Sequence, residues 1–322
     1  MSTVMTPAAA EHTQGQRQNT RPSFFGIVRG EFFKILHQRL NWIMLILLGG
    51  IITLPYLIEL SVPRIKAGLT GPASGQLSFF YNGMEANLSI LRVFIGIFLL
   101  IMTARVIGLE YQLGTIRILL GRGVGRLQLL LAKLLTIVLV ALALFVLAIA
   151  YNLLLSTLLV SIVTGSLSAF NALTPQFWSD SGLYALTVLI SMGVTILLAT
   201  AVTALGRSLT VGLSVALAWF PVDNIGTLFM ALAYRLTQND FWLSITSYFL
   251  GPNLNTMASV VLPQRNGSPA LTIGTGPLVF TVGNQVHGIV VNSTHTLLVA
   301  LVYAVIFAVV AVVLTWRRDV ME

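Results

Sequence analysis

The chain has 322 residues, of which 56% are hydrophobic and only 9% are charged, and its mean hydropathy is +0.90. Soluble domains carry about 25% charged residues, so this composition excludes a soluble globular protein and indicates an integral membrane protein. The formal net charge of +8 does not indicate nucleic-acid binding, because the basic residues lie at the ends of apolar segments. The lack of cysteine excludes disulfides and thiolate-bound metals, and the four histidines show no metal-ligand spacing.

The N-terminal region is predicted to form a tail, an interfacial helix and a first membrane span. Residues 1–20 are polar and lack the apolar core of a signal peptide, so we expect a disordered cytoplasmic tail. Residues 21–40 are amphipathic, with Phe32 on the apolar stripe and Lys34 on the polar face, which is typical of a helix in the membrane interface. Residues 41–60 form the first apolar segment of spanning length.

Five further apolar segments are long enough to span a bilayer, which requires about 20 residues in a helix. They lie at about 87–109, 133–163, 183–205, 209–234 and 296–316. A polar loop, residues 61–86, separates the first two spans, and Pro221 is expected to break the fifth. The sequence therefore predicts an all-α integral membrane protein with six transmembrane helices.

Between the fifth and sixth spans lies a long segment, residues 235–295. Its part Phe241–Leu262 is apolar enough to resemble a seventh span, but Gly251 and Pro252 interrupt it. With six spans and both termini inside, thirteen Lys and Arg face the cytoplasm and five face outside, which agrees with the positive-inside rule. We therefore expect a re-entrant external hairpin before the last span. Two β-prone stretches also predict a small strand hairpin, at Pro277–Val282 and Val286–Asn292.

The most informative stretch is Arg105–Lys133, which holds five of the eighteen Lys and Arg and lies between the second and third spans. If it were one helix, Glu110 and Arg117 would lie two turns and about 10 Å apart on one face. Three glycines then favour a break, since glycine costs about 1 kcal/mol inside a helix. They are Gly121, Gly123 and Gly125. The pattern predicts a short amphipathic helix, a glycine turn and a return to the membrane near Lys133.

The residues Glu110-Tyr-Gln-Leu-Gly-Thr-Ile-Arg117, followed by Leu-Leu-Gly-Arg-Gly and Leu-Leu-Ala-Lys133, resemble the cytoplasmic loop of ABC-2-type transporter permeases. The resemblance implies that this loop is a coupling helix that docks on a separate ATPase subunit, and that residues 21–40 are an elbow helix. The residues it assigns to ATPase coupling are Glu110, Tyr111, Gly114, Thr115, Arg117, Arg122 and Arg126. The residues alone also allow an ordinary basic loop, in which Gly114 and Thr115 simply begin a turn.

The resemblance extends over nearly the whole chain and implies the permease subunit of an ABC transporter in the cytoplasmic membrane, most often an exporter. Two permease chains, as a homodimer or heterodimer, would flank one pathway, and ABC ATPase subunits would hold ATP and magnesium. The chain itself has no G-x-x-x-x-G-K-[ST] motif and no catalytic set of side chains. We therefore expect no enzymatic activity and no cofactor on this chain.

Within the spans, the polar residues Arg92, Asp223 and Asn224 are predicted to line the pathway or to form a structural pair. Arg92 lies thirteen residues from Arg105 and Asp223 sixteen from Arg207, about 20 and 24 Å along a helix, so we expect an ion pair between them. Two other function classes remain open. A secondary transporter or channel would depend on Asp223, and a membrane sensor would show no flux.

Overall fold

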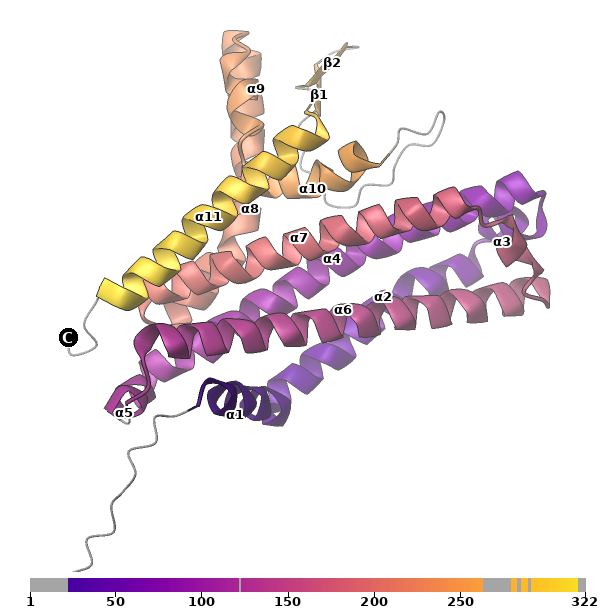
Figure 1. Ribbon diagram of the computed structural model, residues 1–322. Helices are drawn as coiled ribbons and strands as arrows, with labels where there is room; N and C mark the ends of the chain where they lie inside the picture. The colour runs from indigo at the N-terminus through magenta and orange to yellow at the C-terminus, as the bar shows by residue number, and fades with distance from the viewer. Residues whose placement is uncertain (1–22, 122, 263–278, 283–284, 289–290, 318–322) are drawn as a thin grey trace, which may run out of the picture.

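The computed structural model describes residues 23–121, 123–262, 279–282, 285–288 and 291–317. Nearly all of them are helical, and the long helices form an elongated bundle (Figure 1). Within these ranges six helices are long and apolar enough to cross a membrane. They are α2 (Arg39–Ser61), α4 (Ala73–Gln112), α6 (Arg126–Thr164), α7 (Pro175–Gly206), α8 (Leu209–Thr237) and α11 (Ser293–Arg317). The prediction of a multi-pass membrane protein with six such helices agrees with this architecture.

Shorter elements connect or flank these six helices. They are α1 (Phe24–His37), α3 (Pro63–Thr70), α5 (Thr115–Gly121), the 3-10 helix η1 (Ser168–Ala172), α9 (Phe241–Thr246), α10 (Leu250–Val261), β1 (Val279–Val282) and β2 (Gln285–Gly288). The two strands pair antiparallel with Val279 opposite Gly288, within the stretch where a hairpin was expected. The predicted tail and parts of the loop 235–295 lie outside the described residues.

The helices are longer than the apolar segments that predicted them. The expected loop at residues 61–86 is mostly helical, since it holds α3 and the beginning of α4. Phe80 and Tyr81 in this stretch are buried against Phe177 of α7, and this packing stabilises helix where the sequence looked polar. α4 has 40 residues and α6 has 39, which is close to 60 Å of helix and about twice the thickness of a bilayer core.

Local sequence signals explain several helix ends. The Thr174 side chain accepts a hydrogen bond from the Phe177 backbone and Pro175 occupies the first helical position, so α7 starts there. Arg207 adopts a left-handed backbone with φ +46° and ends the same helix. The prediction that Pro221 breaks the fifth span is wrong, because α8 continues through it. Membrane helices tolerate an internal proline when neighbouring groups satisfy the freed backbone.

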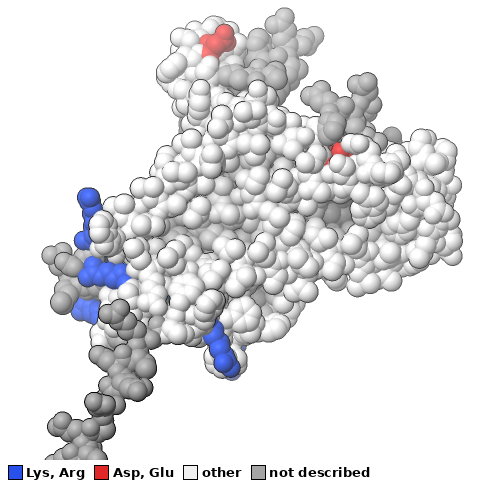
Figure 2. All heavy atoms as spheres, viewed as in Figure 1, with Lys and Arg blue, Asp and Glu red and all other residues white. Residues whose placement is uncertain are grey.

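The core has two halves that share α4 and α7. One half packs α2, α4, α6 and α7 together, and the other packs α4, α7, α8, α10 and α11. We call the end of the bundle at α1 and α5 the α5 end, and the opposite end, at α3 and η1, the η1 end (Figure 1). Figure 2 shows basic side chains gathered at the α5 end, whereas most of the same face carries no charge.

Candidate functional site

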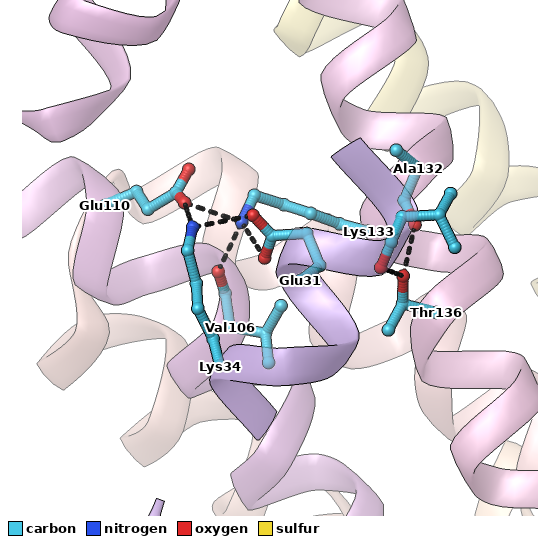
Figure 3. A network of polar contacts seen from close by, with 8 residues as sticks. Glu31, Lys34, Val106, Glu110, Ala132, Lys133 and Thr136 are labelled. Atoms are coloured by element: carbon cyan, nitrogen blue, oxygen red, sulfur yellow. Dashed lines mark hydrogen bonds and ion pairs between the residues drawn. The ribbon is translucent and has the colours of Figure 1, made fainter. Parts of the chain in front are cut away.

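Four charged side chains join α1 to α4 and α6 at the α5 end (Figure 3). Lys133 Nζ lies 2.8 Å from Glu31 Oε2 and 2.9 Å from Glu110 Oε1. Lys34 Nζ lies 2.7 Å from Glu31 Oε1 and 3.0 Å from Glu110 Oε1, the oxygen that Lys133 also contacts. Lys133 also donates a hydrogen bond to the Val106 carbonyl oxygen at 3.0 Å. Two ammonium groups and two carboxylates therefore alternate, and their charges balance.

Most of this network is removed from solvent. The side chains of Lys133, Glu31 and Glu110 are 4%, 5% and 10% exposed, whereas that of Lys34 is 52% exposed. A buried charge without a partner costs several kcal/mol, so these groups are tolerated there because they are paired. Because the network draws residues from three helices, it fixes α1 against α4 and α6.

The protonation of the α1 members agrees with this pairing. Burial acts to raise the pKa of Glu31, but the ammonium groups of Lys133 and Lys34 outweigh it and lower that pKa below its ordinary 4.5. Burial acts to lower the pKa of Lys34, but Glu31 and then Glu110 raise it above its ordinary 10.5. Both side chains are therefore charged at neutral pH.

α1 turns Glu31 toward the bundle and several aromatic residues away from it. Glu31 is buried and Lys34 reaches Glu110 of α4, while Phe25 is 78% exposed and Phe33 is also exposed. The sequence placed Lys34 on the polar face, and in the structure its ammonium pairs with Glu31 and Glu110 while half of the side chain stays exposed. The open surface of α1 therefore combines aromatic side chains with exposed polar ones, among them Arg29 and His37.

The predicted alignment of Glu110 and Arg117 on one helix face is wrong. α4 ends at Gln112 and α5 begins at Thr115, with Gly114 at φ +68° between them. A left-handed backbone suits glycine and ends the helix, so the two halves of the motif belong to different helices. Glu110 joins the buried network, whereas Arg117 is exposed on α5.

The glycine turn after α5 lies where it was predicted. α5 ends at Gly121, and Gly123 has φ +83°, which a residue with a side chain rarely adopts. α6 then begins at Arg126, seven residues before Lys133, where the return to the membrane was expected. The lysine therefore lies two turns inside α6 rather than at its start, and this position brings it to Glu31.

A groove of about 380 Å³ lies between α1, α4 and α5. Three buried polar atoms on its lining residues have no hydrogen-bond partner within the described ranges: Gln38 Oε1, Arg105 Nε and Glu110 Oε2. Buried polar groups are normally paired, so these atoms are available to a molecule that enters the groove. Leu113 and Ile118 also line it and are exposed. The groove thus offers apolar contact beside hydrogen-bonding groups.

The other residues assigned to coupling lie around α5. Thr115 lines the same groove, while Tyr111, Gly114 and Arg117 line a second hollow of about 370 Å³, which they share with Arg207. α5 therefore lies between two hollows. At the start of α6, the guanidinium of Arg126 donates to the Trp316 carbonyl oxygen of α11 at 3.5 Å. Arg122 lies outside the described residues.

The expected ion pair between Arg92 and Asp223 is replaced by separate contacts with α10. The Arg92 guanidinium is buried and donates to the Leu254 carbonyl oxygen at 2.7 Å and to Asn255 Oδ1 at 2.8 Å. The Asp223 carboxylate accepts from the Gly251 backbone N–H, in the first turn of α10. An acidic group at a helix N-terminus is favoured by the free N–H groups there, so α10 supplies what each residue needs.

Asn224 belongs to the same polar chain. Its Oδ1 accepts a hydrogen bond from Asn255 Nδ2 at 3.4 Å, and Asn255 Oδ1 accepts from Arg92. The structure thus brings Arg92, Asp223 and Asn224 to one helix although they do not contact as predicted. The sequence could not show this, because α10 and its asparagines follow after the fifth span.

Sequence reasoning missed Glu31 and Lys133 as partners. Both lie next to or within apolar stretches, where a charge requires a partner. That rule could have marked them as a pair, since each is close to a predicted membrane boundary.

The described residues contain no group of three or more His, Asp or Glu that could hold a metal ion. Comparisons with protein-family models, with curated proteins and with solved structures found no match for this chain.

Proposed function

We propose that this chain is the membrane-spanning permease subunit of an ABC transporter of the ABC-2 type, driven by separate ATPase subunits. Two features support the proposal. Six helices have the length and composition of membrane spans, and the sequence from Glu110 to Arg117 resembles the coupling loop of that family. The observation that carries it is the groove between α1, α4 and α5, whose wall includes residues of the buried charge network.

In this proposal α5 is the coupling helix and α1 is the elbow helix. Leu113 and Ile118 are large, apolar and exposed beside α5, as expected of a surface that a partner covers. ATPase residues would form hydrogen bonds with Gln38 Oε1, Arg105 Nε and Glu110 Oε2, since these three atoms have no partner in the described chain. The exposed aromatic side of α1 suits the membrane interface.

The charge network would transmit movement from α5 into the membrane. Lys133 contacts both Glu31 of α1 and Glu110 of α4, so a push on the end of α4 also moves α1 and α6. ATP-driven closure of two ATPase subunits would then switch a pathway between two permease chains. The basic α5 end would face the cytoplasm, together with both termini, because Lys and Arg resist translocation.

The pathway would lie near the polar chain on α10, with α9 and α10 as the re-entrant pair. Arg92 of α4 and Asp223 and Asn224 of α8 are the residues of the spanning helices that form hydrogen bonds with α10. The low charge of the spans favours a hydrophobic or amphipathic cargo, which the system would export. This assignment of cargo rests on composition and on the family resemblance.

Copurification tests the proposal. The chain is purified in mild detergent from the cells that express it, and ATP hydrolysis and P-loop-containing polypeptides are measured in the eluate. The variant with Leu113→Glu and Ile118→Glu should lose the ATPase, whereas Leu236→Glu, at another exposed site at the far end of α8, should retain it. A wild-type chain without ATPase activity, or equal activity in both variants, would oppose the proposal and favour a channel or secondary transporter.

A further inference from the structure

A further cavity lies far from the α5 end, between α2, α4, α6, η1 and α7. Its volume is about 390 Å³, which is within the range of small-molecule sites. Glu59 on its wall is twenty residues, about 30 Å, from Arg39 at the start of α2. The cavity therefore lies toward the η1 end of the bundle, opposite the groove at α5.

The wall of this cavity is mainly apolar. Its phenylalanines come from four elements and are Phe79, Phe80, Phe145, Phe170 and Phe177. Leu153 and Trp178 also line it and are exposed, so they lie at its opening. Concave apolar surfaces with a few fixed polar groups are typical of ligand sites. The wall therefore suits the hydrocarbon part of a ligand.

The polar groups that lack partners in this wall are hydrogen-bond acceptors. Glu59 Oε2 and Asn87 Oδ1 are buried and have no partner within the described chain, and Asn87 is only 8% exposed. The nearby Tyr56 hydroxyl cannot serve them, because it donates to Asn152 at 3.1 Å. A ligand must therefore supply donors, and the carboxylate favours a donor with positive charge.

We propose that this cavity binds an amphipathic ammonium compound, with its N–H groups at Glu59 and Asn87 and its hydrocarbon part among the phenylalanines. A primary ammonium has three donors and no acceptor, so it matches the two unpartnered acceptors and carries the charge that neutralises the carboxylate. An aminolipid of the bilayer and a free alkylamine share this chemistry. The site is separate from the groove between α1, α4 and α5, so it does not depend on the proposed coupling.

Photolabelling of the purified full-length chain in nanodiscs tests this site. The probe is dodecylamine with a diazirine in its chain, and the matched probe is the corresponding alcohol. Labelled peptides should come from α2, α4, α6 and α7. The alcohol should label them at least about tenfold less, because it lacks the positive charge that strengthens a hydrogen bond to a carboxylate. Equal labelling by the two probes would overturn the proposal without any variant.

Two variants locate the site. Gly83 lines the cavity and has open space where a side chain would begin, so Gly83→Leu should fill the cavity and abolish labelling. Gly96→Leu, on the same helix with equally open space but outside the cavity, should leave labelling unchanged. Glu59→Gln should reduce amine labelling to the level of the alcohol, whereas Asp240→Asn, at an exposed carboxylate elsewhere, should not. Labelling that survives Gly83→Leu would overturn the site.

The lipid of the nanodisc identifies the source of the ligand. If the bilayer supplies it, phosphatidylethanolamine should compete with the amine probe and phosphatidylglycerol should not. If both lipids leave amine labelling equally strong, the occupant is a free amphipathic amine. Labelling spread over all six spanning helices in both lipids would show general partition into the bilayer and would overturn the proposal.

Discussion

The ammonium of Lys133 in α6 lies 2.8 Å from the carboxylate of Glu31 in α1, although 102 residues separate them. Both side chains are almost fully buried. The pair therefore anchors the first helix of the described chain to the third spanning helix. Glu110 and Lys34 extend this contact to α4 and toward the surface.

Loss of one charge from this pair should strongly destabilise the protein. Lys133→Met removes the buried positive charge that pairs with Glu31 and Glu110. Removing one member of a buried ion pair typically lowers the free energy of unfolding by about 3–5 kcal/mol. Lys34→Met should cost about 0–1 kcal/mol, because Lys34 is half exposed. Thermal unfolding in detergent, followed by loss of the monodisperse peak, measures both variants.

The double variant Glu31→Gln and Lys133→Met provides the control for this assignment. It should cost less than the sum of the two single changes, because no charge of the pair is left alone. Additive losses would contradict a direct interaction between the two residues.

The docking of α1 should weaken in acid. The folded pKa of Glu31 lies below its ordinary 4.5, so its stabilising contribution is complete above 4.5 and is lost as pH falls through the lower folded value. The unfolding temperature of the wild type should therefore fall below about pH 4.5, and Glu31→Gln should show a shallower fall from a lower starting value. If the unfolding temperature fell equally steeply with decreasing pH in both proteins, this role of Glu31 would be contradicted.

Exchanging the charges of Arg92 and Asp223 should not restore a stable protein. Arg92→Asp would place a carboxylate against the Leu254 carbonyl oxygen, and Asp223→Arg would place a cation at the Gly251 N–H. Each single change should cost about 1–3 kcal/mol through unpaired buried groups, and the double change should be no better than the worse single change. Recovery of wild-type expression and unfolding temperature in the exchange would instead show direct pairing.

Among the glycines of α4, Gly108 has the closest neighbour, the backbone of Leu209 in α8. A side-chain carbon there would lie 2.7 Å from Leu209 Cα, so Gly108→Ala should cost about 1–3 kcal/mol by forcing the backbones apart. Gly96→Ala on the same helix meets open space and should be neutral or stabilise by up to about 1 kcal/mol. Comparison of unfolding temperatures distinguishes the two sites, and equal effects would contradict the close approach.

The sequence predicted the spanning helices well because long uncharged runs leave few alternatives in a bilayer. It underestimated α4, since aromatic packing of Phe80 and Tyr81 against α7 stabilises helix beyond the apolar run. The sequence also predicted that Glu110 and Arg117 share one helix face. They do not, because Gly114 has a left-handed backbone and separates α4 from α5.

Contacts between distant segments were the part that sequence could not supply. Arg92 and Asp223 reach similar depth, yet each binds α10, whose position depends on the tertiary fold. Glu59 lies near the end of the first predicted span, and it lines the cavity at the η1 end. Whether a charged residue at a membrane boundary faces water or a cavity depends on the packing of neighbouring helices.

Cysteine crosslinking tests the ATPase-coupling proposal most directly, because the chain has no native cysteine. Ile118→Cys places a thiol on the exposed side of α5, and Leu167→Cys places one at an exposed site at the η1 end. With a thiol-to-amine crosslinker in native membranes, Ile118→Cys should join the chain to a polypeptide that carries a P-loop, with a yield that changes on addition of ATP. Leu167→Cys should give no such product. Equal products from both sites, or no P-loop polypeptide at α5 in membranes that contain the intact chain, would contradict the proposal that α5 couples this chain to an ATPase.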